Sequence, residues 1–194
     1  MHLPEAIAHP VFRALQEAAE PCGVRAYVIG GFVRDHLLGR PCKDVDVVVE
    51  GRGVELARQF AEQTGATRSA YYENFGTAMV GFGEYEVEFV GARKESYQRN
   101  SRKPVVEEGT LADDQIRRDF TINALSISLN KEDYGALHDP FGGVRDLNAG
   151  IVRTPTDPLI TFSDDPLRMM RAVRFATQLN FEIDPVTYAA LEEH

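Results

Sequence analysis

The stretch from Val28 to Glu50, VIGGFVRDHLLGRPCKDVDVVVE, constrains the fold more than any other part of the sequence. Two apolar runs flank a segment of helical length, and the first run ends in Gly30 and Gly31. In the second run, Asp44 and Asp46 share one face of a strand and the intervening valines point to the other, because strand side chains alternate. We therefore expect a strand, a short helix, and a second strand that carries two acids on one face.

The other periodicities predict an α/β chain without an internal repeat or a low-complexity tract. We expect a helix that carries Val11, Leu15 and Ala18 and stops at Pro21 to Gly23, and a second helix, GVELARQFAEQTG, that ends at Gly65. A hairpin of the strands FGTAMVGF and EYEVEFVG is expected to turn near Gly83. A long polar loop follows Gly91, LHDPFGGVRDLNAG forms a turn-rich seam, and the chain is helical beyond Ser163. Residues 1–150 are expected to form one domain and residues 151–194 the start of a helical one, within a fragment of a longer protein.

Composition excludes several classes of protein. Of the 194 residues 43% are hydrophobic, enough for one ordinary domain and the start of another, yet no run approaches the roughly 20 apolar residues that span a bilayer. The first residues lack the pattern of a signal peptide, and two cysteines indicate no disulfide framework, so the cytoplasm is the expected location. A net charge of −9 argues against broad nucleic-acid binding, so local basic clusters must carry any such role.

The two aspartates point to a divalent metal. Neighbouring carboxylates resist ionising together, and a bound cation relieves that repulsion; oxygen ligands suit Mg²⁺ or Mn²⁺. Alone, Asp44 and Asp46 would more often be solvated acids on an edge strand. If EYEVEFV neighbours their strand, however, Glu88 joins them, with Glu86 in reserve and Glu84 in solvent. Three such acids match a two-metal site for phosphoryl or nucleotidyl transfer.

The glycine pair suits a phosphate. Gly30 and Gly31 let the backbone approach a ligand closely, the following helix offers N–H groups, and Arg34 supplies a fork of donors. A plain turn between a strand and a helix would explain the glycines equally well. Their spacing from the Asp44–Asp46 pair favours the phosphate-binding interpretation.

Four segments together resemble a known family. GGFVRDHLLG…KDVDVVV, FGTAMV, RRDFTINAL and DDPLRMMRAVRFATQLNF occur in order over about residues 26–181, and they are similar to the class II CCA-adding tRNA nucleotidyltransferases and their bacterial poly(A) polymerase relatives. The resemblance implies an α/β fold: a polymerase-beta-like nucleotidyltransferase head, with a mixed sheet and helices, followed by the first helices of an all-α neck. Enzymes of this family continue with body and tail domains that hold tRNA.

The resemblance also implies roles for the residues above. Gly31 and Arg34 would contact the incoming nucleotide, while Asp44 and Asp46 would hold two metal ions, Mg²⁺ or alternatively Mn²⁺. The expected partners are CTP, ATP and the 3′ end of tRNA, held mainly by the missing domains; no membrane is involved, and the oligomeric state is open.

The segment RRDFTINAL adds a basic pair. The resemblance implies that Arg118 binds the triphosphate, with Arg117 a weaker candidate. The competing interpretation is a basic helix start at which Asp119 serves as a cap and ion-pair partner. Thr121 and Asn123 are expected to hydrogen-bond the local backbone.

Asp165 and Arg168 have a structural and a functional interpretation. Structurally, Asp165 is an N-cap with Pro166 at the first helical position, and the Asp–Arg pair is a surface ion pair of little energy. Functionally, cytosine and adenine each present an amino donor beside a ring-nitrogen acceptor, and an ionised aspartate accepts while an arginine donates. Uracil and guanine present the opposite order and would leave buried groups unpaired. In the family, this pair acts as a protein template.

The rest of that helix carries further candidates. The family has Glu-Asp where this chain has Asp164-Asp165, so the supporting role of the first acid is weaker here. Arg171 and Arg174 continue the spacing of three but drift around the helix, so they are expected to reach ribose, phosphate or the head. The apolar positions are expected to be core: Leu167, Met170, Val173 and Leu179.

Two other features are weaker. His138 and Asp139 stand apart from other metal ligands and are expected to be turn residues. The loop after Gly91 is locally basic, and is either solvated or a mobile element over the nucleotide or primer. Its basic residues are Arg93, Lys94, Arg99, Arg102 and Lys103.

The sequence therefore predicts CCA addition: a tRNA 3′-hydroxyl attacks the α-phosphate of CTP or ATP and releases pyrophosphate. A poly(A) polymerase, or an enzyme that adds only CC or only A, is the nearest alternative. A nucleotide-binding module without catalysis is the alternative from another class.

Overall fold

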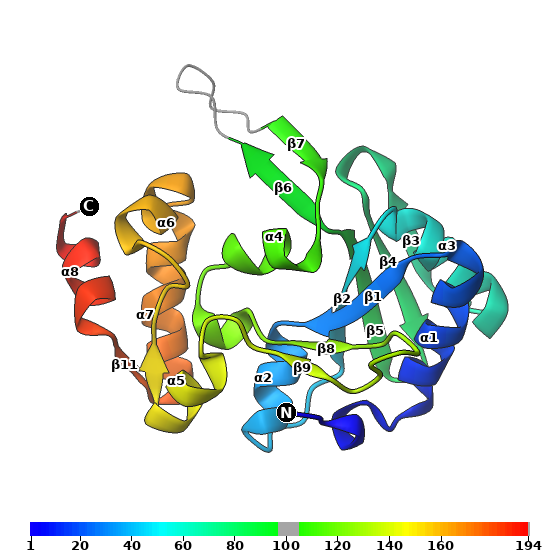
Figure 1. Ribbon diagram of the computed structural model, residues 1–194, viewed down its shortest axis with the longest axis horizontal. Helices are drawn as coiled ribbons and strands as arrows, with labels where there is room; N and C mark the ends of the chain where they lie inside the picture. Colours follow the sequence, from blue (N-terminus) through cyan, green and yellow to red (C-terminus); the bar gives the residue numbers. More distant parts are fainter. Residues whose placement is uncertain (97–104, 194) are drawn as a thin grey trace. The chain divides into compact units, whose positions relative to one another are not determined.

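The structure is a computed structural model that describes residues 1–96 and 105–193 (Figure 1). Its internal contacts divide the chain into two compact units. Unit 1 comprises Met1–Asp114 and Ser126–His138, and unit 2 comprises Gln115–Leu125 and Asp139–His194. The domain boundary at residue 150 stays a prediction.

Unit 1 is built on a seven-stranded sheet with the order β3-β4-β5-β2-β1-β8-β9. Strands β2 and β5 pair in parallel and the other neighbours pair antiparallel, so the sheet is mixed, as expected. The strands are β1 (Arg25–Ile29), β2 (Asp44–Glu50), β3 (Ser69–Tyr72), β4 (Thr77–Phe82), β5 (Tyr85–Gly91), β8 (Ser126–Ser128) and β9 (Leu137–His138).

The helices of unit 1 include the predicted pair, which lie together along one side of the sheet (Figure 1). Both end at glycines in the left-handed region, Gly23 and Gly65, as their sequences predict. Phe60 packs against Phe89 of β5 at 5.5 Å between ring centroids, so this layer covers the sheet face to which Val45, Val47 and Val49 of β2 point. The helical segments are η1 (Pro4–Ile7), α1 (Pro10–Cys22), α2 (Gly31–Leu37), α3 (Gly53–Thr64) and η2 (Glu73–Phe75).

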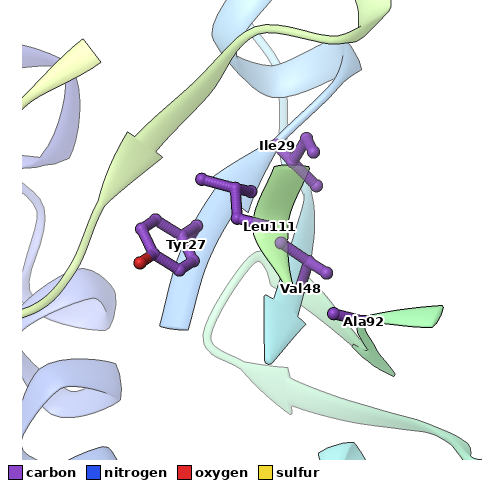
Figure 2. Close-up of a cluster of buried hydrophobic side chains, with 5 residues drawn as sticks. All are labelled: Tyr27, Ile29, Val48, Ala92 and Leu111. Carbon is purple, nitrogen blue, oxygen red and sulfur yellow. The ribbon is translucent and has the colours of Figure 1, made fainter. Parts of the chain in front are cut away.

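The opposite face of the sheet is apolar at one end. Tyr27, Ile29, Val48, Ala92 and Leu111 form a buried cluster there (Figure 2). The backbone N–H of Leu111 donates to Oε1 of Glu50 at 2.8 Å, which fixes the chain over this part of the sheet. The register pairs Ile29 with Asp46, so the acids of β2 continue the same face beyond the apolar cluster.

The segment after Gly91 differs from the expected long loop. Strands β6 (Arg93–Ser96) and β7 (Val105–Glu108) pair antiparallel, and α4 (Leu111–Ile116) follows. Arg93 and Lys94 therefore lie in a strand and not in a loop. This strand was not predicted from the sequence, because its residues are mostly polar and show no apolar periodicity. Arg99, Arg102 and Lys103 lie outside the described residues.

Unit 2 is mainly helical. Its elements are η3 (Thr121–Asn123), α5 (Gly143–Ala149), β10 (Ile151–Val152), α6 (Pro158–Asp164), α7 (Leu167–Leu179), β11 (Glu182–Ile183) and α8 (Pro185–Glu193). Helix α5 arises within the turn-rich seam and packs closely on η3: a Cβ on Gly143 would lie 2.4 Å from the carbonyl oxygen of Thr121. Phe120 meets Phe175 of α7 edge to face, with ring centroids 6.0 Å apart.

The expected core face of α7 is wrong for three of its four residues. Leu167, Met170 and Val173 are 70%, 71% and 54% exposed, whereas Leu179 is buried. The buried positions are 172, 175 and 179, on the opposite side of the helix. Apolar side chains occupy both sides of α7, and hydrophobic spacing alone does not distinguish a buried stripe from an exposed one.

Two other expectations concern the whole chain. Cys22 and Cys42 are free thiols, and burial raises the pKa of each above its ordinary value. Over residues 1–96 and 105–193, no helix is both long enough and apolar enough to cross a membrane.

Candidate functional site

The acids of β2 and β5 lie side by side in unit 1. The parallel register pairs Asp44 with Glu86 and Asp46 with Glu88, and paired positions share a sheet face. Strand β5 thus neighbours β2, which is the condition for a third carboxylate beside the aspartates. Glu84 lies before β5, pairs with Lys43 at 3.1 Å and is solvated, in line with the expectation.

This face has the donor chemistry of a divalent cation site. Val45, Val47 and Val49 are fully buried on one side of β2, while Asp46 is half-buried and Asp44 exposed on the other. Oxygen donors on adjacent strands fit Mg²⁺ or Mn²⁺. As they stand, the side chains of the described residues form no group of three or more His, Cys, Asp or Glu that could hold a metal. The metal assignment to Asp44, Asp46 and Glu88 therefore stays a prediction.

The glycine turn lies beside Arg34. Gly30 has φ 79° and ψ −131°, a conformation that only glycine adopts freely, and α2 begins at Gly31. Both Nε and Nη2 of Arg34 lie 2.9 Å from Oδ1 of Asp35, and the arginine is buried. A Cβ on Gly31 would lie 3.6 Å from Nη2 of Arg34, so this guanidinium borders the turn. Asp35, which orients it, was missed because an acid inside a short helix carries no distinctive sequence signal.

Unit 2 contains a cavity of about 420 Å³ that gathers four of the predicted nucleotide-binding residues. Its lining is Arg117, Arg118, Asp119, Asp165, Leu167, Arg168 and Arg171. Four guanidinium groups face two carboxylates, so the cavity is locally positive within a chain of net charge −9. Such a cavity favours an anionic ligand.

Asp165 and Arg168 are both held by the backbone. The N–H of Leu167 donates to Oδ1 of Asp165 at 3.0 Å, so the predicted helix cap is present. The other oxygen, Oδ2, lies 3.9 Å from Nε of Arg168. Arg168 also donates to the carbonyl oxygens of Arg117 at 2.7 Å and Thr161 at 3.3 Å, which fixes the plane of its guanidinium. The cap uses one carboxylate oxygen, so it is compatible with a ligand contact at the other.

The two later arginines of α7 have different surroundings. Arg171 lines the cavity, and its Nε lies 2.7 Å from Oδ2 of Asp119. Arg174 is exposed, lies outside the cavity lining, and has its guanidinium carbon 4.8 Å above the ring of Phe175. The structure thus brings Arg171, but not Arg174, to the other predicted residues of unit 2.

Thr121 and Asn123 of RRDFTINAL hydrogen-bond to side chains, which the expectation of bonds to the local backbone did not include. Nδ2 of Asn123 donates to Oδ1 of Asp119 at 3.1 Å, and Oγ1 of Thr121 donates to Oδ2 of Asp146 at 2.7 Å. Asp119 lies four residues before Asn123 in the same segment, whereas Asp146 lies 25 residues beyond Thr121 and is brought to it by tertiary packing. The expected ion pair of Asp119 is present, with Arg171 as its partner.

His138 and Asp139 have structural partners. In unit 1, Nε2 of His138 lies 3.5 Å from Oδ2 of Asp133. In unit 2, the carboxylate of Asp139 accepts from the N–H groups of Gly143 and Val144 at 2.6 and 3.1 Å, and so caps α5. The expectation of a turn residue is wrong for His138, which lies in β9 and pairs with Ser126 of β8, whereas Asp139 lies between β9 and α5.

The Poly A polymerase head domain family matches residues 26–153. The chain belongs to this family. The A-adding tRNA nucleotidyltransferase of Aquifex aeolicus (strain VF5) is 48% identical over 170 residues, which cover 88% of this chain and 20% of the relative. The CCA-adding enzyme of Levilactobacillus brevis is 41% identical over 197 residues, which cover 100% of this chain and 46% of the relative.

Solved structures agree with this poly(A) polymerase head domain. A tRNA nucleotidyltransferase complexed with a primer tRNA and an incoming ATP analog has a TM-score of 0.79 at 42% identity, over 92% of this chain and 49% of the other. The Thermotoga maritima CCA-adding enzyme complexed with tRNA_CCA has a TM-score of 0.82 at 32% identity, over 100% of this chain and 45% of the other. The predicted α/β nucleotidyltransferase head is confirmed. The chain spans between a fifth and about half the length of the relatives it matches.

Proposed function

We propose that this chain is the nucleotidyltransferase head and first neck helices of an enzyme that adds CMP and AMP, from CTP and ATP, to the 3′ end of tRNA. Relatives named A-adding tRNA nucleotidyltransferase and CCA-adding enzyme support this proposal. So does the solved relative that holds a primer tRNA and an ATP analog. A cytoplasmic location remains part of the proposal.

The observation that carries the proposal is the pairing of Asp165 and Arg168 in the positive cavity of unit 2. Oδ2 of Asp165 accepts from the amino group of cytosine or adenine, while an N–H of Arg168 donates to the adjacent ring nitrogen. Uracil and guanine would leave both protein groups unpaired, at a cost of about 1–3 kcal/mol for each group that the bound base shields from water. The carbonyls of Arg117 and Thr161 hold the guanidinium in place before the nucleotide binds.

In the proposed reaction, the tRNA 3′-hydroxyl oxygen forms a bond to the α-phosphorus, and the bond from that phosphorus to the pyrophosphate oxygen breaks. Asp44, Asp46 and Glu88 would hold divalent cations. When bound, such ions supply positive charge for the attacking oxygen and the triphosphate. Gly30, Gly31, Arg34 and Arg118 would bind the triphosphate, with Arg171 and Arg174 on its ribose or phosphate side.

Addition of adenosine alone is the second candidate. It is favoured by the 48% identity to an A-adding relative, against 41% for a CCA-adding one. The same Asp165–Arg168 pair would serve it, because cytosine and adenine offer the same donor–acceptor order.

The test presents the full-length protein with three RNAs: a tRNA transcript that ends at the discriminator base, one that ends in CC, and an A-rich RNA. With CTP and ATP, the proposal predicts CCA on the first and A on the second. Extension of only the CC-ending tRNA indicates A addition, and long adenosine tails on the A-rich RNA indicate a poly(A) polymerase. Nucleotide binding without extension of any RNA would contradict catalysis, and an Asp46→Asn variant controls for contaminating activity.

A further inference from the structure

Asp119 is a buried carboxylate whose two oxygens are both occupied by protein donors. Oδ1 accepts from the N–H of Phe120 at 2.8 Å and from Nδ2 of Asn123 at 3.1 Å. Oδ2 accepts from Nε of Arg171 at 2.7 Å. The residue is 7% exposed although it lines the cavity. A carboxylate with these partners is suited to orienting a neighbour rather than to binding a ligand itself.

The neighbour that it orients is Arg171. The Asp119 contact uses Nε alone, and the guanidinium carbon lies 5.2 Å from the ring centroid of Phe175. These two contacts constrain both the direction and the plane of the fork. Of its five N–H groups, the four on the terminal nitrogens have no hydrogen-bond partner in the described parts of the chain.

Arg168 and Arg171 therefore differ in how many terminal guanidinium nitrogens can donate to a ligand without giving up a protein acceptor. Arg168 already uses both terminal nitrogens on carbonyl oxygens, whereas Arg171 keeps both. Arg171 also lies three residues further along α7, about 4.5 Å down the axis from the base-reading pair. It is therefore placed for an oxygen that lies away from the base edge.

We propose that Asp119 is a positioning residue that holds Arg171 so that the terminal amino groups of Arg171 donate to phosphate oxygens of the bound nucleoside triphosphate. This inference rests on the proposed function. The positive balance of the cavity favours phosphate over a neutral acceptor. Because CTP and ATP share their phosphates, Asp119 sets affinity without choosing between bases.

The experiment measures dissociation constants of CTP, ATP and UTP for the full-length protein. The variants are Asp119→Asn, Arg171→Lys and the double variant. Asp119→Asn turns an amide toward Nε of Arg171 and releases the fork, while Arg171→Lys keeps the ion pair but loses the fork. Each is expected to weaken CTP and ATP binding alike, by about tenfold, with the preference over UTP unchanged. The double variant should bind little more weakly than either single variant, because each single change already removes the oriented Arg171 guanidinium that Asp119 and Arg171 form together.

The control is Arg145→Lys, which alters another Asp-paired arginine of unit 2 outside the cavity, 3.7 Å from Asp146, and should leave affinity unchanged. Thermal unfolding checks the fold of Asp119→Asn. If that variant unfolds, Arg171→Lys decides, since it retains a cation for Asp119.

Several results would overturn the inference: unchanged affinity in Arg171→Lys, multiplied losses in the double variant, or a loss that separates CTP from ATP. A wild-type protein that binds none of these nucleotides would instead overturn the proposed function together with this inference. Wild-type binding with a normal response to Asp165→Asn, but none to Asp119→Asn and Arg171→Lys, would overturn this inference alone.

Discussion

Replacing Asp165 separates its role as a helix cap from its proposed role in reading bases. Oδ1 accepts from the N–H of Leu167 at 3.0 Å, and loss of such a cap to alanine costs about 1 kcal/mol of folding free energy, whereas asparagine caps about as well as aspartate. The ion pair with Arg168 adds little stability, because the two groups lie 3.9 Å apart and the carboxylate is half exposed. We therefore expect Asp165→Ala to lower the unfolding free energy by about 1 kcal/mol and Asp165→Asn to leave it nearly unchanged.

Asp165→Asn, which should hardly change stability, should nevertheless change the choice of nucleotide in catalysis. In Asp165→Asn the side chain offers either an amide donor or a carbonyl acceptor, so uracil and guanine no longer leave residue 165 unpaired, although Arg168 still faces their ring N–H. The Asp165 share of the discrimination, about 1–3 kcal/mol, corresponds to roughly 5- to 150-fold in incorporation, and this share should disappear. The assay combines incorporation of each of the four nucleotides with chemical unfolding, in the full-length protein. Unchanged preference for C and A in Asp165→Asn would refute base reading and leave the cap as the only role.

The remaining predictions concern the sheet acids and the packing of α5. Asp44→Ala and Asp46→Ala should each abolish turnover in the full-length enzyme while the unfolding midpoint stays close to wild type, because Asp44 is exposed and Asp46 only half-buried, beyond the apolar cluster on their face of the sheet. Comparable activity of both variants at saturating Mg²⁺ would contradict the two-metal assignment. Gly143→Ala should destabilise the chain by about 1–3 kcal/mol in chemical unfolding, because the new Cβ would lie 2.4 Å from the carbonyl oxygen of Thr121; a neutral result would contradict this close packing.

The sequence predicts most of unit 1 because local and long-range signals agree there. Valine alternation in β2, the glycine caps of α1 and α3, and the turn at Gly83 each specify one element, and the mixed sheet brings β2 beside β5. The positions of Asp46 and Glu88 follow from the period of two, since strand register places alternate residues on one face.

Unit 2 is less predictable because its organisation depends on partners distant in sequence. Arg168 bonds to the carbonyl of Arg117, and Arg171 to Asp119, across about fifty residues. No periodicity encodes such pairs. The exposure of Leu167, Met170 and Val173 was missed for the same reason: α7 is apolar on two sides, and only tertiary packing selects which is buried.

The central claim is that the Asp165–Arg168 pair admits cytosine and adenine and rejects uracil and guanine. Its most direct test is incorporation by the wild-type full-length protein into tRNA, with each of the four nucleotides supplied alone and at equal concentration. We predict C on tRNA that lacks its 3′ end and A on tRNA that ends in CC, with U and G added at least about fivefold more slowly. Addition of U or G at rates comparable to C and A would contradict the account.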